Sequence, residues 1–314
     1  MAAKPCCNHS GPSRAGWQQR GLALVAVLWV LVLLSLLAAN LSQGSRSNAQ
    51  LAQNLVAATQ GKYASEAGMQ WALWNLQQPP DEQWLADGSV QRLLLDDIPV
   101  RVALQDESGK IDLNAAPVEL LSGLFLAAEL DASTADALAD AILDWRDDDD
   151  LRRLNGAEDD DYLAAGREDG AKDASFERVE ELQRVLGMTA DIYRRVKGSL
   201  TVFNGLPAIN PLYAPRLALL ALPGADEGTV DQYIEQRRRN RLDGLDAPEP
   251  PLPESQYMTA GREGVNYTVL AEAEVGPVVR ARFSAQIQRR GRSAQGGLSR
   301  VQREMEPLFE EVGM

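Results

Sequence analysis

The chain has 314 residues, of which 45% are hydrophobic and 24% are charged, and its formal net charge is −14. This composition is typical of a globular protein and excludes a wholly disordered one. Both cysteines and the single histidine lie within the first ten residues, at Cys6, Cys7 and His9. A mature chain without that stretch would have no Cys-His or Ser-His-Asp catalytic site, no zinc finger and no intrachain disulfide. Its carboxylates and carbonyls would remain as ligands for hard cations such as calcium.

The N-terminus has the features of an export and anchoring segment. Residues 1–20 are basic and contain no acidic residue, and residues 21–41 form an apolar run. About 20 apolar residues in a helix span a hydrocarbon core of roughly 30 Å. Because the basic residues precede the span, we expect a cytoplasmic N-terminus and an exported C-terminal part. An ordinary secretory signal, cleaved near Ala38 and Ala39, is the alternative.

Helical periodicity continues beyond the apolar run. Small and apolar residues recur there at spacings of three and four, at Leu51, Leu55, Ala58, Ala67, Trp71 and Trp74. The pattern predicts an amphipathic helix, which Pro79 and Pro80 end. Gly61 and Gly68 each weaken such a helix by about 1 kcal/mol relative to alanine. A span that continues into one long helix suits a subunit packed among like helices, and an anchor followed by a linker is the simpler alternative.

Alternating patterns in two parts of the remaining chain predict strands. Residues 99–104 alternate, a turn signal follows, and we expect residues 110–113 to return as a second strand. Towards the C-terminus, residues 269–275 and 279–287 alternate on either side of a Gly-Pro turn. We expect these two segments to form an antiparallel hairpin with one face in water. The tail from Gly291 is first rich in Arg and Gly and then acidic, and it carries no pattern that predicts an element.

Residues 114–262, between the two groups of strands, are expected to fold mainly as short helices and loops. Segments 114–125 and 209–224 form a weak repeat, each with a proline placed to open a helix. Segments 185–196 and 222–237 resemble helix-hairpin-helix units, with a glycine at the turn between the helices. These patterns predict a large helical insertion within a sheet-containing domain.

Helix-hairpin-helix units often bind DNA phosphates through turn amides, so a membrane-anchored DNA receptor is a rival function. Charge argues against it. The leader contains three basic residues and no acidic residue, so its removal changes the net charge from −14 to −17. DNA-binding domains are expected to be basic. The cluster Arg237, Arg238 and Arg239 is the one feature that favours the rival, and we expect protein packing modules and no nucleic-acid partner.

The start of the chain resembles a type IV prepilin or pseudopilin. The resemblance rests on a basic leader that ends at Arg20-Gly21 directly before an uninterrupted apolar helix. It implies that a dedicated membrane peptidase cleaves between Gly21 and Leu22 and methylates the new N-terminus. The family usually has Glu at the fifth mature position, where this chain has Ala26. A carboxylate within the hydrocarbon core is energetically costly unless it has a charged partner. In pilins that partner is the N-terminal amine of the neighbouring subunit. A subunit at the end of the fibre has no such neighbour, so an apolar residue is expected at this position.

Five further motifs occur in the order and spacing of one family of minor pseudopilins, general secretion pathway protein K of the type II secretion system. These are SGKIDLNAAP at 108–117, AILDWRDDDD at 141–150, NGAEDDDY at 155–162, FERVEELQRVLGMT at 176–189 and ALPG at 221–224. The resemblance implies an α+β fold, in which a long transmembrane and amphipathic helix precedes a pilin-like antiparallel sheet. The sheet carries a large inserted all-helical domain of helix-hairpin-helix or SAM-like type.

The resemblance also implies a function and a location. The chain is expected to be a non-enzymatic minor pseudopilin in the bacterial inner membrane, with a periplasmic C-terminal domain. It would lie at the tip of the pseudopilus and initiate or cap its assembly for protein secretion. Its expected partners are other minor pseudopilins, the major pseudopilin and the prepilin peptidase. A generic anchored periplasmic calcium-binding interaction protein remains an alternative.

The expected organisation follows the chain in seven parts. They are a prepilin leader at 1–21, a transmembrane helix at 22–41, the periplasmic part of the same helix at 42–80, the first strands at 81–113, the inserted helical domain at 114–262, the C-terminal strands at 263–290 and the tail at 291–314.

The acidic loop at 144–161 is the only candidate site for chemistry. It contains nine carboxylates against three arginines, and its spacing does not match an EF-hand. A solvated acidic loop is the simpler interpretation, and a pair of carboxylates for acid–base catalysis would need an apolar cleft. The resemblance favours calcium, because calcium-binding loops are known in this family. The expected ligands are Asp147, Asp149, Glu158, Asp160 and Asp161.

Overall fold

A computed structural model describes residues 20–250, 252, 255–260, 264–276, 279–289 and 298–308. Residues 1–19, which include Cys6, Cys7, His9 and most of the expected leader at 1–21, lie outside the described part. The chain divides into two compact units, Met1–Val56 and Ala57–Met314.

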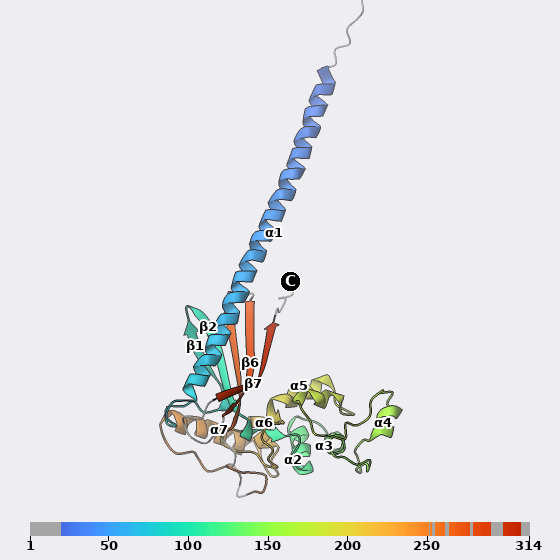
Figure 1. Cartoon of the computed structure of the whole chain (residues 1–314), viewed down its shortest axis with the longest axis vertical. Helices are drawn as coiled ribbons and strands as arrows, with labels where there is room; N and C mark the ends of the chain where they lie inside the picture. The colour runs from blue at the N-terminus through green and yellow to red at the C-terminus, as the bar shows by residue number, and fades with distance from the viewer. Residues whose placement is uncertain are drawn as a thin grey trace, which may run out of the picture. The chain divides into compact units, whose positions relative to one another are not determined.

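The predicted N-terminal helix is confirmed as one continuous element. Helix α1 runs from Arg20 to Asn75 and ends just before Pro79 and Pro80 (Figure 1). It is long and apolar enough to cross a membrane by length and composition, with a mean hydropathy of 2.6 over its most apolar window. The apolar side chains of its first unit, from Leu24 to Leu41, are exposed within the chain, as expected for a helix that lies in lipid.

The second unit contains a five-stranded antiparallel sheet. Its order is β1-β2-β5-β6-β7, with β1 at Asp87–Leu95, β2 at Ile98–Asp106, β5 at Asn266–Val275, β6 at Val279–Arg289 and β7 at Leu298–Leu308. The last turns of α1 pack on one face of this sheet, where Met69 and Ala72 meet Val102 and Phe283 in a shared core. The predicted α+β fold is therefore confirmed.

Two glycines let α1 lie close to the sheet. A Cβ atom on Gly68 would lie 2.7 Å from Val100 Cγ1, and one on Gly61 would lie 3.0 Å from Ala281 Cβ. The sequence indicated only that these glycines weaken the helix. The structure shows that their lack of a side chain sets the helix–sheet distance.

The predicted C-terminal hairpin is confirmed, and one of its faces is buried. Val275 pairs with Val279 across the turn, and Val269, Ala271 and Phe283 are fully buried. The opposite face carries a ladder of partly exposed ion pairs. Its members are Arg101–Glu272 at 3.3 Å, Arg101–Glu274 at 3.0 Å, Arg280–Glu274 at 3.4 Å and Arg282–Glu272 at 3.9 Å.

The prediction that residues 110–113 return beside 99–104 is wrong. The partner of β2 is β1, which precedes it and joins it through Asp96 and Asp97, both with positive φ. Residues 107–109 form a short 3-10 turn, η1 (Glu107–Gly109), and β3 (Ile111–Asp112) then pairs in parallel with β4 (Leu200–Thr201). The two-residue turn escaped prediction because Asp-Asp is a weaker turn signal than Asn-Gly. The tail also contributes a strand, β7, that no alternation predicted.

The insertion between β2 and β5 is helical and has a hydrophobic core of its own. Its α-helices are α2 (Val118–Ala127), α3 (Ala132–Arg146), α4 (Asp159–Ala164), α5 (Ala190–Val196), α6 (Arg216–Leu220) and α7 (Glu227–Leu242). Two 3-10 turns, η2 (Val179–Arg184) and η3 (Lys197–Ser199), also belong to it. The expected all-helical insertion contains one short strand as well, β4, which pairs with β3. Fully buried Leu121, Phe125 and Ile142 belong to this second core.

The predicted prolines and turn glycines take the expected places. Pro117 and Pro215 are the N-cap residues of α2 and α6. Gly187 and Gly224 have φ of 83° and 85°, and each lies two residues before the N-cap of the next helix, α5 or α7. Positive φ at these turns is a conformation that glycine adopts without strain.

The insertion lies at one end of the sheet. Gly61 of α1 approaches Val275 and Val279, which flank the turn at the other end. Beyond the end of α1, the carbonyl of Leu76 accepts a hydrogen bond from Arg289, at the far end of β6. Asp106, the last residue of β2, pairs with Tyr267 near the start of β5. The insertion connects these two strand ends, so it lies at the end of the sheet where α1 ends (Figure 1).

Candidate functional site

The acidic site forms where α3 ends and α4 begins. Asp144 lies in the last turn of α3, Asp147 is the C-cap residue of that helix, and Glu158 is the N-cap residue of α4. Residues three apart on a helix share a face, so Asp144 and Asp147 point the same way. The loop between the helices returns closely, because a Cβ on Gly156 would lie 1.9 Å from Asp144 Oδ2.

Aromatic packing beneath the site holds the two helices together. Trp145 is 1% exposed, and its ring centroid lies 5.9 Å from that of Tyr162 on α4 and 6.1 Å from that of Phe176. The Tyr162 hydroxyl accepts a hydrogen bond from the Leu186 amide, 3.0 Å away. This packing therefore holds α3 and α4, and the acidic residues at their ends, in place relative to each other.

Three carboxylates converge at this point. One oxygen from each of Asp144, Asp147 and Glu158 lies within 4.8 Å of the others. Asp144 is fully buried and Glu158 is 7% exposed. The only cation hydrogen-bonded to the group among the described residues is Arg153, whose Nη1 lies 2.7 Å from Asp144 Oδ1 and 2.5 Å from Asp147 Oδ2.

Two of the oxygens have no hydrogen-bond partner among the described residues. Asp147 Oδ1 and Glu158 Oε1 are both buried and unsatisfied. A buried acceptor that is left unpaired is costly, and most native ones have a protein, water or ion partner. These two atoms therefore point to a ligand.

The electrostatic environment indicates a deficit of positive charge. Burial, together with the charges of Asp144, Asp147, Asp173 and Asp150, raises the pKa of Glu158 to about 7. Burial also raises the pKa of Asp144, against the hydrogen bonds and charge of Arg153. One guanidinium thus compensates three carboxylates incompletely.

The residues present fit a calcium ion. All the donors are carboxylate oxygens, which suit a hard cation that takes 6 to 8 oxygen ligands, and two of them are unpartnered. The Arg153 side chain is 37% exposed, so it can move into water when a cation takes its place. Asp144, Asp147 and Glu158 would hold the ion. When bound, it would supply the charge neutralisation that this loop lacks.

The structure brings together only part of the predicted ligand set. Asp147 and Glu158 belong to the converging group. Asp149 Oδ1 accepts from the Leu151 amide, and Asp161 accepts from the Glu158 amide at 3.1 Å and pairs with an exposed arginine. Asp160 is exposed in the first turn of α4.

Sequence reasoning left Asp144 out of the chosen ligands. The sequence did contain one indication, because Asp144 lies three residues before Asp147 and residues three apart on a helix share a face. Its burial and its nearness to Glu158, fourteen residues later, follow from the tertiary fold alone.

The basic cluster that favoured a DNA-binding function has internal partners. Arg237 is 2% exposed, and it donates to the carbonyls of Pro211 and Ala214 and to Asp87 Oδ2 at 3.1 Å. Arg238 donates to the same Asp87 oxygen at 2.9 Å. A buried guanidinium cannot reach a phosphate, so Arg237 is not available to bind nucleic acid. Arg238 and Arg239 are 48% and 68% exposed, and Arg239 pairs with Glu235 on the same helix.

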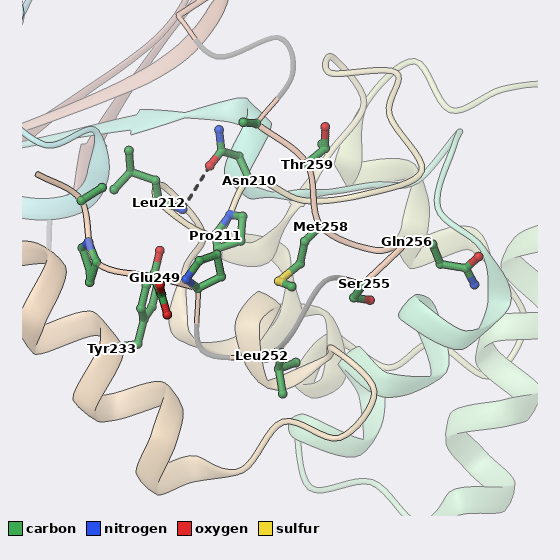
Figure 2. A pocket seen from close by; sticks show the side chains of 14 residues that line it. Asn210, Pro211, Leu212, Tyr233, Glu249, Leu252, Ser255, Gln256, Met258 and Thr259 are labelled. Atoms are coloured by element: carbon green, nitrogen blue, oxygen red, sulfur yellow. Dashed lines mark hydrogen bonds between the residues drawn. The ribbon is translucent and has the colours of Figure 1, made fainter.

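A hollow with a volume of about 1220 Å³ lies between α7 and the chain that follows it (Figure 2). Tyr233, Leu252 and Met258 line it, and Asn210 Oδ1 accepts from the Leu212 amide there at 3.1 Å. Glu249 is the only acidic residue among its described lining residues. The described lining residues therefore include one carboxylate and no carboxylate pair.

Comparison with known proteins finds similarity to one family. A family model described as type II secretion system (T2SS), protein K matches residues 101–205, which extend from β2 to the segment after β4. Type II secretion system protein K of Klebsiella pneumoniae is 27% identical over 227 residues, 65% of this chain and 70% of that protein. The Pseudomonas aeruginosa protein K is 27% identical over 255 residues, 73% of this chain and 75% of its own length.

A protein K relative from Escherichia coli strain K12 is 27% identical over 201 residues, which are 57% of this chain and 61% of that relative, less than two thirds of its length. The fold is shared with a chain in the crystal structure of the GspK-GspI-GspJ complex from the type 2 secretion system of enterotoxigenic Escherichia coli. The TM-score is 0.59 at 18% identity, over 82% of this chain and 99% of that one. The family model, the relatives and the fold agree with the sequence motifs and confirm the predicted resemblance to the type II secretion system protein K family.

Proposed function

We propose that this protein is a minor pseudopilin at the tip of the periplasmic pseudopilus, where it initiates or caps assembly. The observation that carries the proposal is the place of the insertion, at the end of the sheet where α1 finishes. A pilin-type subunit stacked above that end would collide with α2–α7. Only the distal position avoids the collision.

Ala26 supports the same position. A glutamate there would neutralise the terminal amine of a neighbouring subunit within the membrane, and alanine cannot do so. The protein K homologue in the structural match was crystallised with GspI and GspJ. By analogy, we infer that this chain binds two smaller minor pseudopilins and, through them, the major pseudopilin. The role is structural and not catalytic.

The tip assignment is tested by labelling this protein on surface fibres that form when the major pseudopilin is overproduced. We expect label at one end only, and shorter fibres when this protein is overproduced. Ala26→Glu should not convert the protein into a major fibre subunit. Label spread evenly along the fibres would refute the assignment.

The anchoring proposal follows the leader motif. We propose that the prepilin peptidase cleaves between Gly21 and Leu22, that the new amine is methylated, and that α1 holds the protein in the inner membrane with its globular part in the periplasm. N-terminal sequencing from membranes should give Leu22 as the first residue. A Gly21→Val variant should remain unprocessed. A mature N-terminus near Asn40 would contradict this proposal.

We also propose that the group Asp144, Asp147 and Glu158 binds calcium. The support is the pair of unpartnered buried oxygens and the incomplete compensation by Arg153. An ion that binds only the folded state stabilises it by mass action, by about 2.7 kcal/mol at a concentration 100 times the dissociation constant. The calcium-loaded protein should therefore melt at a higher temperature than the chelated protein.

The matched control uses an acid of the same loop. Glu158→Gln combined with Asp147→Asn should remove most of the calcium-dependent rise in melting temperature, whereas Asp160→Asn should preserve it. Isothermal titration with calcium chloride gives the stoichiometry. An unchanged melting temperature after addition of chelator would show that the loop is merely solvated.

A further inference from the structure

Strand β1 leaves one edge of the sheet open in the described part of the chain. Leu95 pairs with Ile98 across the two-residue turn, and the pair that flanks such a turn exchanges both backbone hydrogen bonds. Alternate residues of β1 therefore bond to β2. Val90, Arg92 and Leu94, which lie between them, direct their backbone N–H and C=O groups to the open edge.

The two edges of the sheet differ in sequence. Natural proteins protect edge strands with charges and proline. The opposite edge strand, β7, has the sequence LSRVQREMEPL, with four charged residues and a proline. The nine residues of β1, DGSVQRLLL, include no proline, and the only charge beyond the buried Asp87 is Arg92. The β1 edge therefore lacks the protection that β7 has.

The side chains at the open edge of β1 are exposed among the described residues. Val90 is 55% exposed and Leu94 is 69% exposed. Arg92 is exposed and makes no ion pair with any described residue. It lies opposite Arg101, which already pairs with two glutamates of β5. The edge thus presents an uncompensated positive charge between two exposed apolar side chains.

We propose that β1 is a docking edge to which a sister minor pseudopilin adds a strand, with an acidic residue opposite Arg92 and apolar residues beside it. Main-chain hydrogen bonds would supply the affinity of such strand addition, and alternate side chains its specificity. The inference rests on the proposed function, because it takes its partner from the pseudopilus.

A second copy of this chain fits the edge poorly. In any two-fold antiparallel pairing through Val90, Arg92 and Leu94, the two Arg92 side chains lie either directly opposite each other or on the adjacent diagonal. Like charges at these positions destabilise a strand pair. The charge pattern of β1 therefore selects a different, acidic strand.

Cysteine cross-linking in membranes tests the edge in the full-length chain with Cys6 and Cys7 replaced by serine. Leu94→Cys and Val90→Cys should form disulfides with cysteines at alternate positions of an edge strand in a sister minor pseudopilin. The matched control is Leu93→Cys, on the half-buried face of β1, which should not cross-link. An alternating pattern is the signature of strand pairing, since successive side chains point to opposite faces.

A second variant tests the charge. Arg92→Glu should weaken capture of the sister subunits by the full chain about tenfold or more, because it places like charges opposite each other. Arg194→Glu, at an exposed arginine of α5, should leave capture unchanged. An intact complex with no β1 cross-links, or cross-links to a second copy or to an exported protein, would overturn the docking edge while the proposed function stands. If the unsubstituted chain forms no complex with sister subunits, both fail.

Discussion

The buried ion pair between Asp87 and Arg237 joins the sheet to the insertion, and its removal should be strongly destabilising. Asp87 opens β1 and Arg237 lies on α7, 150 residues later, with their side chains 0% and 1% exposed. Asp87→Ala would leave a buried guanidinium whose remaining partners are the carbonyls of Pro211 and Ala214. Removing one member of a buried pair typically costs about 3–5 kcal/mol. We expect about 3 kcal/mol here, because the two carbonyls still accept hydrogen bonds from the arginine.

A neighbouring arginine provides the matched control. Arg238 donates to the same carboxylate at 2.9 Å, but its side chain is 48% exposed. Arg238→Ala should therefore cost about 1 kcal/mol or less. The double variant Asp87→Asn with Arg237→Met removes both charges, and it should recover most of the loss.

Urea denaturation followed by tryptophan fluorescence measures these differences on a fragment that begins at Ala57, the compact second unit. The m-values should remain equal, so that a changed midpoint reports a changed free energy of unfolding. If Asp87→Ala lowers the free energy of unfolding no more than Arg238→Ala does, the ion pair does not stabilise the packing of the insertion on the sheet, and this prediction is refuted.

The same pair has a defined pH dependence. Burial alone would raise the pKa of Asp87, but the hydrogen bond from Ser89 and the charges of Arg237 and Arg238 outweigh it and hold the pKa below 3.8. A group whose pKa is lowered on folding contributes stability above its unfolded pKa and loses it as the pH falls through the folded value. The difference between parent and Asp87→Ala should therefore be constant near neutral pH and shrink only below about pH 3.8.

Two further predictions concern packing and titration. Gly123→Ala would place a Cβ 2.2 Å from the carbonyl oxygen of Ala221, so it should lower the free energy of unfolding by about 1–3 kcal/mol. The control is Gly198→Ala, whose Cβ would have no atom within 4 Å. It should leave the free energy of unfolding nearly unchanged in the same urea assay. Burial raises the pKa of Asp106 to about 6, against a hydrogen bond from the Gly264 amide, so its contribution to stability should be complete below pH 3.8 and decline as the pH rises through 6. Carbon NMR of that carboxyl group should titrate near 6, and titration near 4 would refute the prediction.

Local patterns in the sequence were sufficient for the elements whose signals lie within a few residues. The apolar run and its helical continuation predicted α1, because a 3.6-residue period is a property of consecutive residues. Strict alternation around Gly276-Pro277 predicted the β5–β6 hairpin for the same reason. Gly187 and Gly224 could be placed at turns, since a residue with positive φ is most often glycine.

Contacts between distant residues were decided only by the tertiary structure. The parallel pairing of Ile111 with Leu200 spans some ninety residues and has no local signal, so the strand at 110–113 was assigned to the wrong neighbour. Arg237 looked like part of a basic surface, and its burial against Asp87 became visible only when α7 met the first strand of the sheet.

The acidic loop shows the same division most clearly. Its composition left two interpretations open between residues 144 and 161, a solvated loop and a cation site, because crowded carboxylates repel one another unless water or a cation separates them. The resemblance to the protein K family favoured the cation site. Which oxygens converge depends on how α3, α4 and the aromatic residues beneath them pack. That packing buries Asp144 beside Asp147 and Glu158 and leaves Asp160 in water, because a helix brings residues three apart together while only the fold joins residues fourteen apart.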